Sequence, residues 1–409
     1  MSTPIEIQQP IAARTRQYDP IAIAHTTAKI AATYAATTDE EGRFPQESLQ
    51  ELKRNGLMGL IVPQTYGGMG ASYTTMAQVA QILASACLST SMIWAMHCQQ
   101  VATIVDHAPE ELKQDVLPRI ARGEMFIASV TTEREKGGHL FSAHAALKQG
   151  NDEEEVQLIR DAPVVTGGAY ADSYLITMRI DEQSQLSEVV LVYADRAQLT
   201  IETQAGWHTM GMRGTQSVAM LLQGDISRKQ VINPPGGFAQ IGVSTLVPVG
   251  HIAWASAWLG AVKGAFHQMV TIFHNPTARK GFNLQSELLT VRLARVRLQL
   301  DTVDAYLSQI VDEYEHLRLN QHDKQSIEVS PGFNIRINNL KLLASETLFA
   351  AIDQLVQLGG LRYGYQKNVY TTLERTFRDV RSASLMYTND RLLLANGKLT
   401  LLDGNLLPA

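Results

Sequence analysis

Six short runs between Glu124 and Ile232 decide the fold, because this is the only long part of the chain with the composition of β-strands. The runs are Phe126–Thr132 (FIASVTT), Val156–Arg160 (VQLIR), Ser173–Ile180 (SYLITMRI), Glu188–Ala194 (EVVLVYA), Gln198–Thr203 (QLTIET) and Ser217–Leu222 (SVAMLL). Several alternate apolar with polar residues, and turns such as Lys136-Gly137-Gly138 separate them. No long helical pattern lies between them, which disfavours a parallel sheet of strand–helix–strand units. The stretch predicts a small antiparallel β-barrel or sandwich.

Helical patterns flank this stretch on both sides. The predicted helices before it are 20–38, 45–55 (broken by Gly56), 73–107 and 110–122, and those after it are 242–274, 289–317, 335–358 and 371–396. Gly359-Gly360 are expected to cap the helix over 335–358. The fold class is therefore α+β, mainly α. We expect a flexible arm (1–19), an N-terminal helical domain (20–123), a β-domain (124–235) and a C-terminal four-helix bundle (236–409).

The helix over 289–317 has the clearest periodicity in the chain. Its apolar residues are spaced alternately four and three apart, as in the seam of a left-handed bundle: Leu289, Leu293, Val296, Leu300, Val303, Leu307, Ile310, Tyr314 and Leu317. Each of these side chains is expected in the core of the bundle.

Composition suits a soluble globular protein. The chain is 45% hydrophobic and 18% charged, and its net charge of −5 does not indicate nucleic acid or an anionic membrane as a partner. Cys87 and Cys98 are too few for a disulfide framework or a zinc site, so we expect no metal and a reducing compartment. Residues 1–19 lack the apolar core of a signal peptide. Pro248 and Gly250 interrupt the most apolar stretch, 243–262, which we interpret as a buried helix. These observations favour a cytoplasmic enzyme.

Several motifs occur in the order found in one flavoprotein family. They are Gly59-Leu60-Ile61-Val62-Pro63 with Tyr66-Gly67-Gly68, Leu117–Glu124 (LPRIARGE), Thr132-Glu133, Met210–Thr215 (MGMRGT), Arg279-Lys280-Gly281-Phe282, Gln357–Gly360 (QLGG) and Arg378-Asp379. From about residue 20 to 396 the chain resembles the acyl-CoA dehydrogenase family. The resemblance implies FAD as cofactor and a homotetramer or homodimer.

The resemblance also implies which residues bind the cofactor. Thr131, Thr132 and Thr166 would contact the flavin ring, which needs hydrogen bonds along one edge and an apolar wall. Arg213, in the signature of the second half of the β-domain, would also belong to the cofactor site. A neighbouring subunit would supply Arg279 to the pyrophosphate, accompanied by Phe282, and Gln357 and Gly360 would line the adenine end.

The sequence departs from the family at the catalytic base. Desaturation of a thioester needs a group that removes the α-proton while a hydride leaves the β-carbon. Tyr387 stands where the usual glutamate is expected, and Asp390 is the nearest carboxylate. His251 is one residue from a second position that the family uses for its base, and could be a base or a substrate contact. Val164 replaces a tryptophan that commonly covers one face of the flavin.

Three functions stay open at this point. The first is an FAD-dependent dehydrogenase that desaturates an acyl or aminoacyl thioester of CoA or an acyl carrier protein and passes electrons to an acceptor flavoprotein. The second is a flavin-dependent monooxygenase of the same fold that uses reduced flavin and O₂. The third is a catalytically inactive flavoprotein. The missing glutamate and Val164 favour the second, whereas the order of the motifs favours the first.

Overall fold

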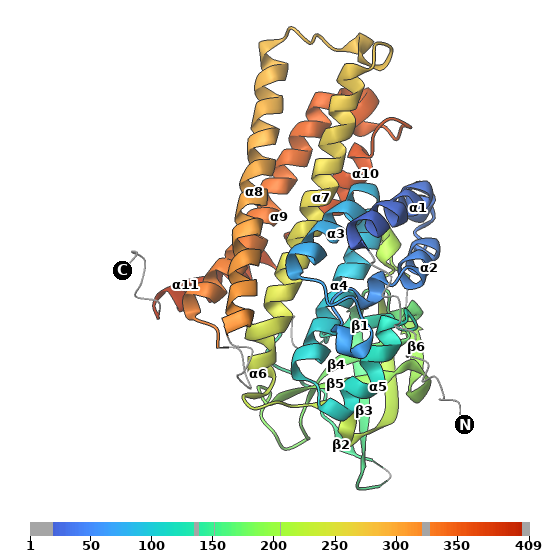
Figure 1. Cartoon of the computed structure of the whole chain (residues 1–409), viewed down its shortest axis with the longest axis vertical. Helices are drawn as coiled ribbons and strands as arrows, with labels where there is room; N and C mark the ends of the chain where they lie inside the picture. The colour runs from blue at the N-terminus through green and yellow to red at the C-terminus, as the bar shows by residue number, and fades with distance from the viewer. Residues whose placement is uncertain (1–18, 135–138, 151, 205, 321–327, 403–409) are drawn as a thin grey trace, which may run out of the picture.

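The computed structural model describes residues 19–134, 139–150, 152–204, 206–320 and 328–402. A helical part, two β-sheets and a helical bundle follow one another along the chain (Figure 1). This order confirms the predicted α+β, mainly α fold. The arm expected over 1–19 lies almost wholly outside the described residues. The helices of the first part are α1 (Pro20–Glu41), α2 (Gln46–Arg54), α3 (Tyr73–Ala86), α4 (Leu88–His107) and α5 (Glu110–Ala121).

The eight described strands form two sheets of four strands each. They are β1 (Ile127–Val130), β2 (Lys148–Gln149), β3 (Glu155–Val165), β4 (Ser173–Arg179), β5 (Val189–Asp195), β6 (Thr200–Gln204), β7 (Val218–Ser227) and β8 (Val231–Ile232). The first sheet has the order β1-β4-β5-β8 and the second β2-β3-β7-β6. The pairing is antiparallel as predicted, except that β1 runs parallel to β4. Between β1 and β4 the chain passes through β2 and β3, which belong to the other sheet. These strands, rather than a helix, form the long connection that two parallel strands need.

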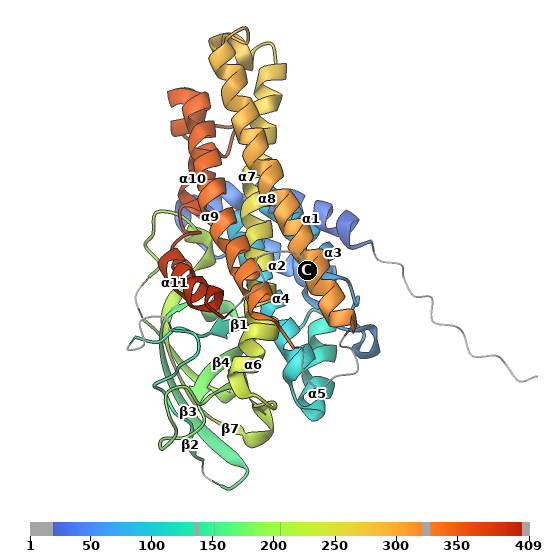
Figure 2. The ribbon, with the colours of Figure 1, turned by 90° about the vertical axis from the view of Figure 1, so that its left-hand side faces the viewer.

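The helices after the sheets are α6 (Gly237–Ile241), α7 (Val247–His274), α8 (Glu287–Asn320), α9 (Pro331–Gly360), α10 (Leu373–Val380) and α11 (Asn389–Thr400). Figure 2 shows α7, α8 and α9 rising together above the sheets. Six residues of the predicted seam on α8 are buried, from Val296 to Tyr314, and the outermost three pack partly buried against the core. The seam was therefore predicted correctly.

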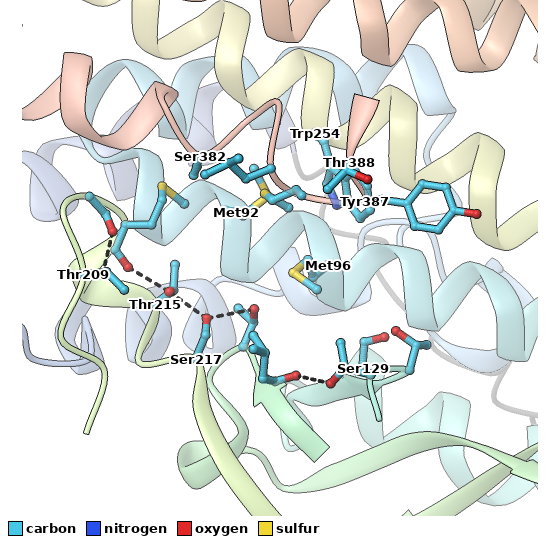
Figure 3. A pocket seen from close by; sticks show the side chains of 18 of the residues that line it. Met92, Met96, Ser129, Thr209, Thr215, Ser217, Trp254, Ser382, Tyr387 and Thr388 are labelled. Atoms are coloured by element: carbon cyan, nitrogen blue, oxygen red, sulfur yellow. Dashed lines mark hydrogen bonds between the residues drawn. The ribbon is translucent and has the colours of Figure 1, made fainter. Parts of the chain in front are cut away.

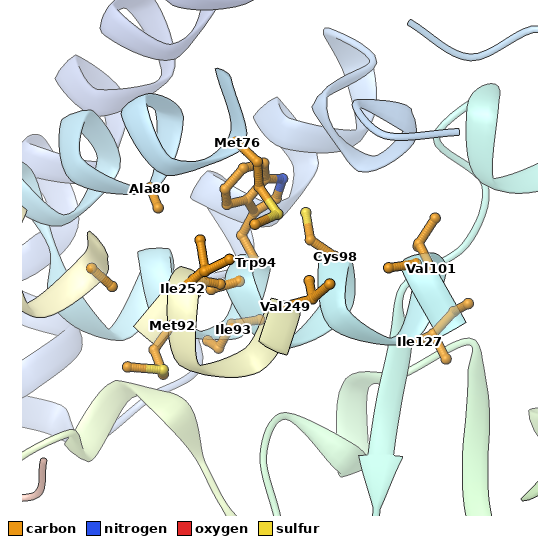
Figure 4. Close-up of a cluster of buried hydrophobic side chains, with 14 of the residues drawn as sticks. Met76, Ala80, Met92, Ile93, Trp94, Cys98, Val101, Ile127, Val249 and Ile252 are labelled. Carbon is orange, nitrogen blue, oxygen red and sulfur yellow. The ribbon is translucent and has the colours of Figure 1, made fainter. Parts of the chain in front are cut away.

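The core that supports the cavity described below lies where α3, α4 and α7 meet β1. Trp94 and Ile252 are fully buried there, close to Met76, Cys98 and Ile127 (Figure 4). The indole Nε1 of Trp94 donates to the carbonyl oxygen of Leu57 at 2.9 Å, so burial leaves no polar atom of this ring without a partner. This packing fixes the end of β1 relative to α4 and α7.

The pair Gly359-Gly360 ends α9 as predicted: the helix runs to Gly360, where φ is +58°, and a π-helical turn follows over Leu361–Tyr365. A second prediction about the C-terminal helices was wrong. The single helix expected over 371–396 is two helices, α10 and α11, separated by turns. Tyr387 has φ of +45°, which an α-helix does not allow, so the break lies at a residue expected in the site.

Within the described residues, one helical segment, Gly237–His274, is long and apolar enough to cross a membrane. Its most apolar window is 89% buried inside the protein, against α3, α4 and α9. Burial by the rest of the chain therefore accounts for its apolar composition, as we interpreted it from the sequence.

Candidate active site

A cavity of about 820 Å³ opens between the β-sheets and the lower part of the bundle. The wall on the sheet side carries hydroxyl groups, the wall formed by α4 and α7 is mainly apolar, and a third wall comes from residues 378–391 (Figure 3). The apolar residues are Met92, Met96, Leu140, Val164, Trp207, Met210, Met212, Leu246, Val247, Trp254, Leu385 and Met386. Such a cavity suits a planar apolar group with one polar edge.

The hydroxyl side of the cavity contains the three threonines predicted to contact a flavin. Thr132 donates from Oγ1 to the carbonyl oxygen of Val164 at 2.8 Å. The hydroxyl of Thr166 lies 3.0 Å from that of Ser217, and Ser217 lies 2.8 Å from Thr215, which in turn donates to the backbone (Figure 3). Thr131 also lines the cavity. The structure therefore brings Thr131, Thr132 and Thr166 together at one polar edge.

A buried ion pair fixes this edge from behind. The guanidinium of Arg160 is fully buried and donates to Glu133 at 2.8 Å and to the carbonyl oxygen of Thr132 at 3.0 Å. Glu133 also accepts hydrogen bonds from the amides of His144 and Ala145. Because separating a buried ion pair is costly, these contacts permit little displacement of the turn after β1.

The third polar element of the site is the loop over 207–217. Arg213 does not line the cavity; it donates to the carbonyl oxygens of Asp39 and Glu40 at the end of α1, at 2.7 and 3.2 Å. Arg378 pairs with Asp39 at 2.6 Å and donates to the carbonyl oxygen of Met210. A side chain at Gly211 would lie 2.1 Å from the carbonyl oxygen of Arg378, so only glycine fits there. These contacts give Arg213 the role of an anchor for the loop.

Three described non-glycine residues have a positive φ: Met212, Gln216 and Tyr387. Met212 and Tyr387 line the cavity, and Gln216 lies between Thr215 and Ser217, which also line it. Each such residue stores strain of about 1–3 kcal/mol, which persists only where surrounding contacts impose it. All three are in or beside the cavity walls.

His251 is the one candidate base that is both unprotonated and turned to the cavity. Its Nδ1 lies 3.2 Å from the carbonyl oxygen of Ile337, so this nitrogen carries the proton and Nε2 is left as the acceptor. Burial, and secondarily the charge of Lys341, lowers the pKa of His251 to about 3. The imidazole is therefore neutral at any pH near neutrality. Its ring packs 5.6 Å from that of Trp254.

The other two candidate bases are less well placed. Tyr387 lines the cavity, but burial raises the pKa of its hydroxyl, which keeps the phenol protonated. Asp390 is exposed in the first turn of α11 and does not line the cavity. Among the described residues that line the cavity there is no aspartate or glutamate, whereas three arginines line it: Arg378, Arg381 and Arg391.

The side chain of Gln99 packs against Gly250, the residue before His251. A Cβ on Gly250 would lie 2.3 Å from Nε2 of Gln99. Gln99 reaches across from α4, lines the cavity, and donates to the carbonyl oxygen of Leu246 at 2.6 Å. The space beside Gly250 is thus already occupied. Gln99 was missed by sequence reasoning, as were Met92, Met96, Trp207, Trp254 and the arginines at 381 and 391; only the four-residue spacing of the two methionines on α4 could have indicated a shared face.

The remaining predicted cofactor residues lie together near the C-terminal end of α9, and none lines the cavity of its own chain. Phe282 packs between Phe273 and Tyr363, and its ring centroid lies 5.0 Å from that of Phe273 and 5.6 Å from that of Tyr363. Tyr363 also donates to the carbonyl oxygen of Ala278, which ties the Arg279 turn to this end of α9. Arg279, Gln357 and Gly360 are exposed.

Comparison with known proteins places this site in context. The sequence model named "Acyl-CoA dehydrogenase, N-terminal domain" matches residues 22–124, and that of the C-terminal domain matches 239–387. A short-chain specific acyl-CoA dehydrogenase of Clostridium acetobutylicum is 23% identical over 350 residues, which cover 85% of this chain and 87% of the relative.

Two solved structures are similar in fold. FMN-bound TdsC of Paenibacillus sp. A11-2, whose structures include one named dibenzothiophene monooxygenase, has a TM-score of 0.82 at 17% identity over 94% of this chain and 98% of its own. The prolyl acyl carrier protein oxidase AnaB has a TM-score of 0.78 at 20% identity over 93% and 98%. At these identities the likeness concerns the fold alone.

Proposed function

Because the chain belongs to the acyl-CoA dehydrogenase family, we propose that this FAD-dependent oxidoreductase desaturates an acyl thioester, with His251 as acceptor of the α-proton. The observation that carries the proposal is that His251 lines the cavity while its Nδ1 is bonded to the carbonyl oxygen of Ile337, which leaves Nε2 as the unprotonated nitrogen. A pKa of about 3 lies only about one unit below that of an ordinary glutamate, so the imidazole is a base of comparable strength.

The residues present fit the flavin ring. Its hydrogen-bonding edge requires donors and acceptors, which the hydroxyls of Thr131, Thr132 and Thr166 and the backbone around them supply. Val164 and Trp207 offer apolar surface beside these groups. When bound, FAD supplies the acceptor for the hydride that leaves the β-carbon. The protein holds the thioester so that Nε2 of His251 takes the α-proton, and the electron pair of that C–H bond becomes part of the new double bond.

Charge in the cavity favours an uncharged or anionic acyl group over a cationic aminoacyl group. No described lining residue is acidic, so an ammonium group would meet no counter-charge, and the three arginines would repel it. The apolar surface of Met92, Met96 and Trp254 suits a hydrocarbon chain. CoA and an acyl carrier protein present the same pantetheine arm, and we propose a separate flavoprotein as electron acceptor.

We further propose a homotetramer or homodimer. Arg279 is exposed and does not reach the cavity of its own chain, which supports a role in the FAD site of a neighbour. The outer face of α8 supports this assembly, because Leu288, Val291 and Leu298 are 60%, 49% and 66% exposed in one stripe.

Anaerobic mixing tests the proposal. Short, medium and branched acyl-CoA thioesters are added to the FAD-loaded protein, and the oxidised flavin band should bleach with at least one of them. His251→Gln should slow bleaching about 10²-fold or more, the usual effect of losing a general base. Asp390→Asn is the matched control and should leave the rate within a few-fold. Unchanged bleaching in the His251 variant would remove His251 as the base.

A monooxygenase is the second candidate, favoured by the absence of acidic residues among the described residues that line the cavity and by Val164, which is 39% exposed. Oxygen insertion requires no carboxylate base. If no thioester bleaches the flavin, and isotopic oxygen from O₂ enters a product when NADH and a flavin reductase are supplied, this second function replaces the first.

A further inference from the structure

Lys341 on α9 is the only buried lysine in the described part of the chain, with no exposed surface. Its ammonium donates to Oδ1 of Asn389 at 2.6 Å and to the carbonyl oxygen of Tyr387 at 3.2 Å. Burial lowers the pKa of Lys341 to about 8. Because a buried ammonium is costly without hydrogen bonds, these two acceptors are the reason it is tolerated.

Both acceptors belong to one turn. The chain leaves α10, passes through Tyr387 with its φ of +45°, and enters α11 at Asn389. Asn389 also donates to Ser345 at 3.1 Å and to Glu346 at 2.9 Å, both on α9. Tyr387 and Asn389, the residues on either side of Thr388, are therefore both held by contacts with α9. These contacts fix the strained backbone of Tyr387.

The turn forms one wall of the cavity. Leu385, Met386, Tyr387 and Thr388 line it, whereas Lys341 lies behind them and does not. We propose that Lys341 is a positioning residue, whose hydrogen bonds to Tyr387 and Asn389 hold this turn in the shape that forms the substrate side of the cavity. The proposal rests on the proposed function only in assigning this wall to the substrate.

Packing alone does not explain a lysine here. A methionine of similar length would fill the same space without burying a charge. It would, however, leave the carbonyl oxygen of Tyr387 without this donor and Oδ1 of Asn389 with only the donor from Ser345. An acceptor that loses its donor favours another backbone conformation. Since φ at Tyr387 is unfavourable for a tyrosine, loss of the donor should release it.

Hydrogen exchange of the FAD-loaded protein tests this without any substrate. In Lys341→Met, exchange of the amides of residues 386–389 should accelerate about tenfold or more, while amides in the middle of α7 stay protected. Lys341→Gln keeps a hydrogen-bond donor, so its exchange rate at residues 386–389 should lie between those of Lys341→Met and the wild type. Lys398→Met, which removes an exposed lysine from α11, is the control and should change nothing.

A second readout separates positioning from general stability. With a thioester that bleaches the flavin, Lys341→Met should raise KM about tenfold with a smaller change in kcat, and Lys341→Gln should recover part of the loss. If Lys341→Met does not fold, Asn389→Ala replaces it, because it removes one of the two acceptors. Unchanged exchange at residues 386–389 in a folded variant would overturn the proposal, whether or not any thioester is a substrate.

Discussion

Acid should destabilise the folded protein through His251, and the size of the effect follows from its surroundings. The folded protein holds the pKa of His251 at about 3, against an ordinary value of 6.5. Below pH 6.5 the imidazole of His251 is therefore protonated in the unfolded chain, whereas in the folded protein it stays unprotonated until the pH approaches 3. The contribution of neutral His251 to the free energy of unfolding is fully present above pH 6.5. It is lost as the pH falls from 6.5 towards 3, at about 1.4 kcal/mol per pH unit.

Between pH 7.5 and 5.0 this single group should cost about 2 kcal/mol of the free energy of unfolding. His97 should contribute a similar amount, because burial lowers its pKa to about 4. The assay is urea unfolding of the wild type and of His251→Gln at both pH values. In the variant the acid-induced loss should be smaller by about 2 kcal/mol, since glutamine binds no proton.

His25→Gln, at an exposed position on α1, is the control and should behave as the wild type. Subtraction of the variant from the wild type cancels the contribution of His97. Equal acid sensitivity in the wild type and His251→Gln would refute the reasoning, and with it the neutral imidazole on which the proposed proton transfer depends.

Two further predictions concern the cofactor and the edge of its site. Arg279→Ala should weaken FAD binding about tenfold or more by removing a cation from the pyrophosphate, whereas Lys280→Ala should leave FAD binding unchanged. Equilibrium dialysis measures the affinity for FAD. A protein that is monomeric in light scattering and still binds FAD tightly would contradict this prediction. Glu133→Gln should lower the free energy of unfolding by about 3 kcal/mol, because Arg160 would stay buried without its counter-charge; a urea midpoint equal to that of the wild type would contradict this.

Elements with a long regular pattern were predictable from the sequence. The seam of α8 follows from a repeat that only a packed helix explains, and the β-region follows from its alternation. The parallel pairing of β1 with β4 was not predictable, because it depends on which sheet each intervening strand joins. The break between α10 and α11 was missed for a related reason: contacts from α9, a distant segment, hold Tyr387 in a conformation that its residue type does not favour.

The candidate site divides in the same way. Thr131, Thr132 and Thr166 were expected in the site from the resemblance to the family, and they lie on one polar edge of the cavity. Gln99 could not be predicted, since its contacts with Gly250 and with the carbonyl oxygen of Leu246 join segments far apart in the sequence. Lys341 carries no signal either, because an isolated lysine in a helix is ordinarily expected at the surface.

Backbone strain bears on whether the site is active. Met212, Gln216 and Tyr387 are held by groups outside the cavity: Asp379 accepts from the amide of Met212, Gln216 donates to the carbonyl oxygen of Gly42, and Lys341 donates to Tyr387. Strain of about 1–3 kcal/mol per residue lowers stability and is found where a site must hold a particular shape. A scaffold without chemistry would gain stability by relaxing these residues. Their concentration around a single cavity therefore favours an active enzyme over an inactive flavoprotein.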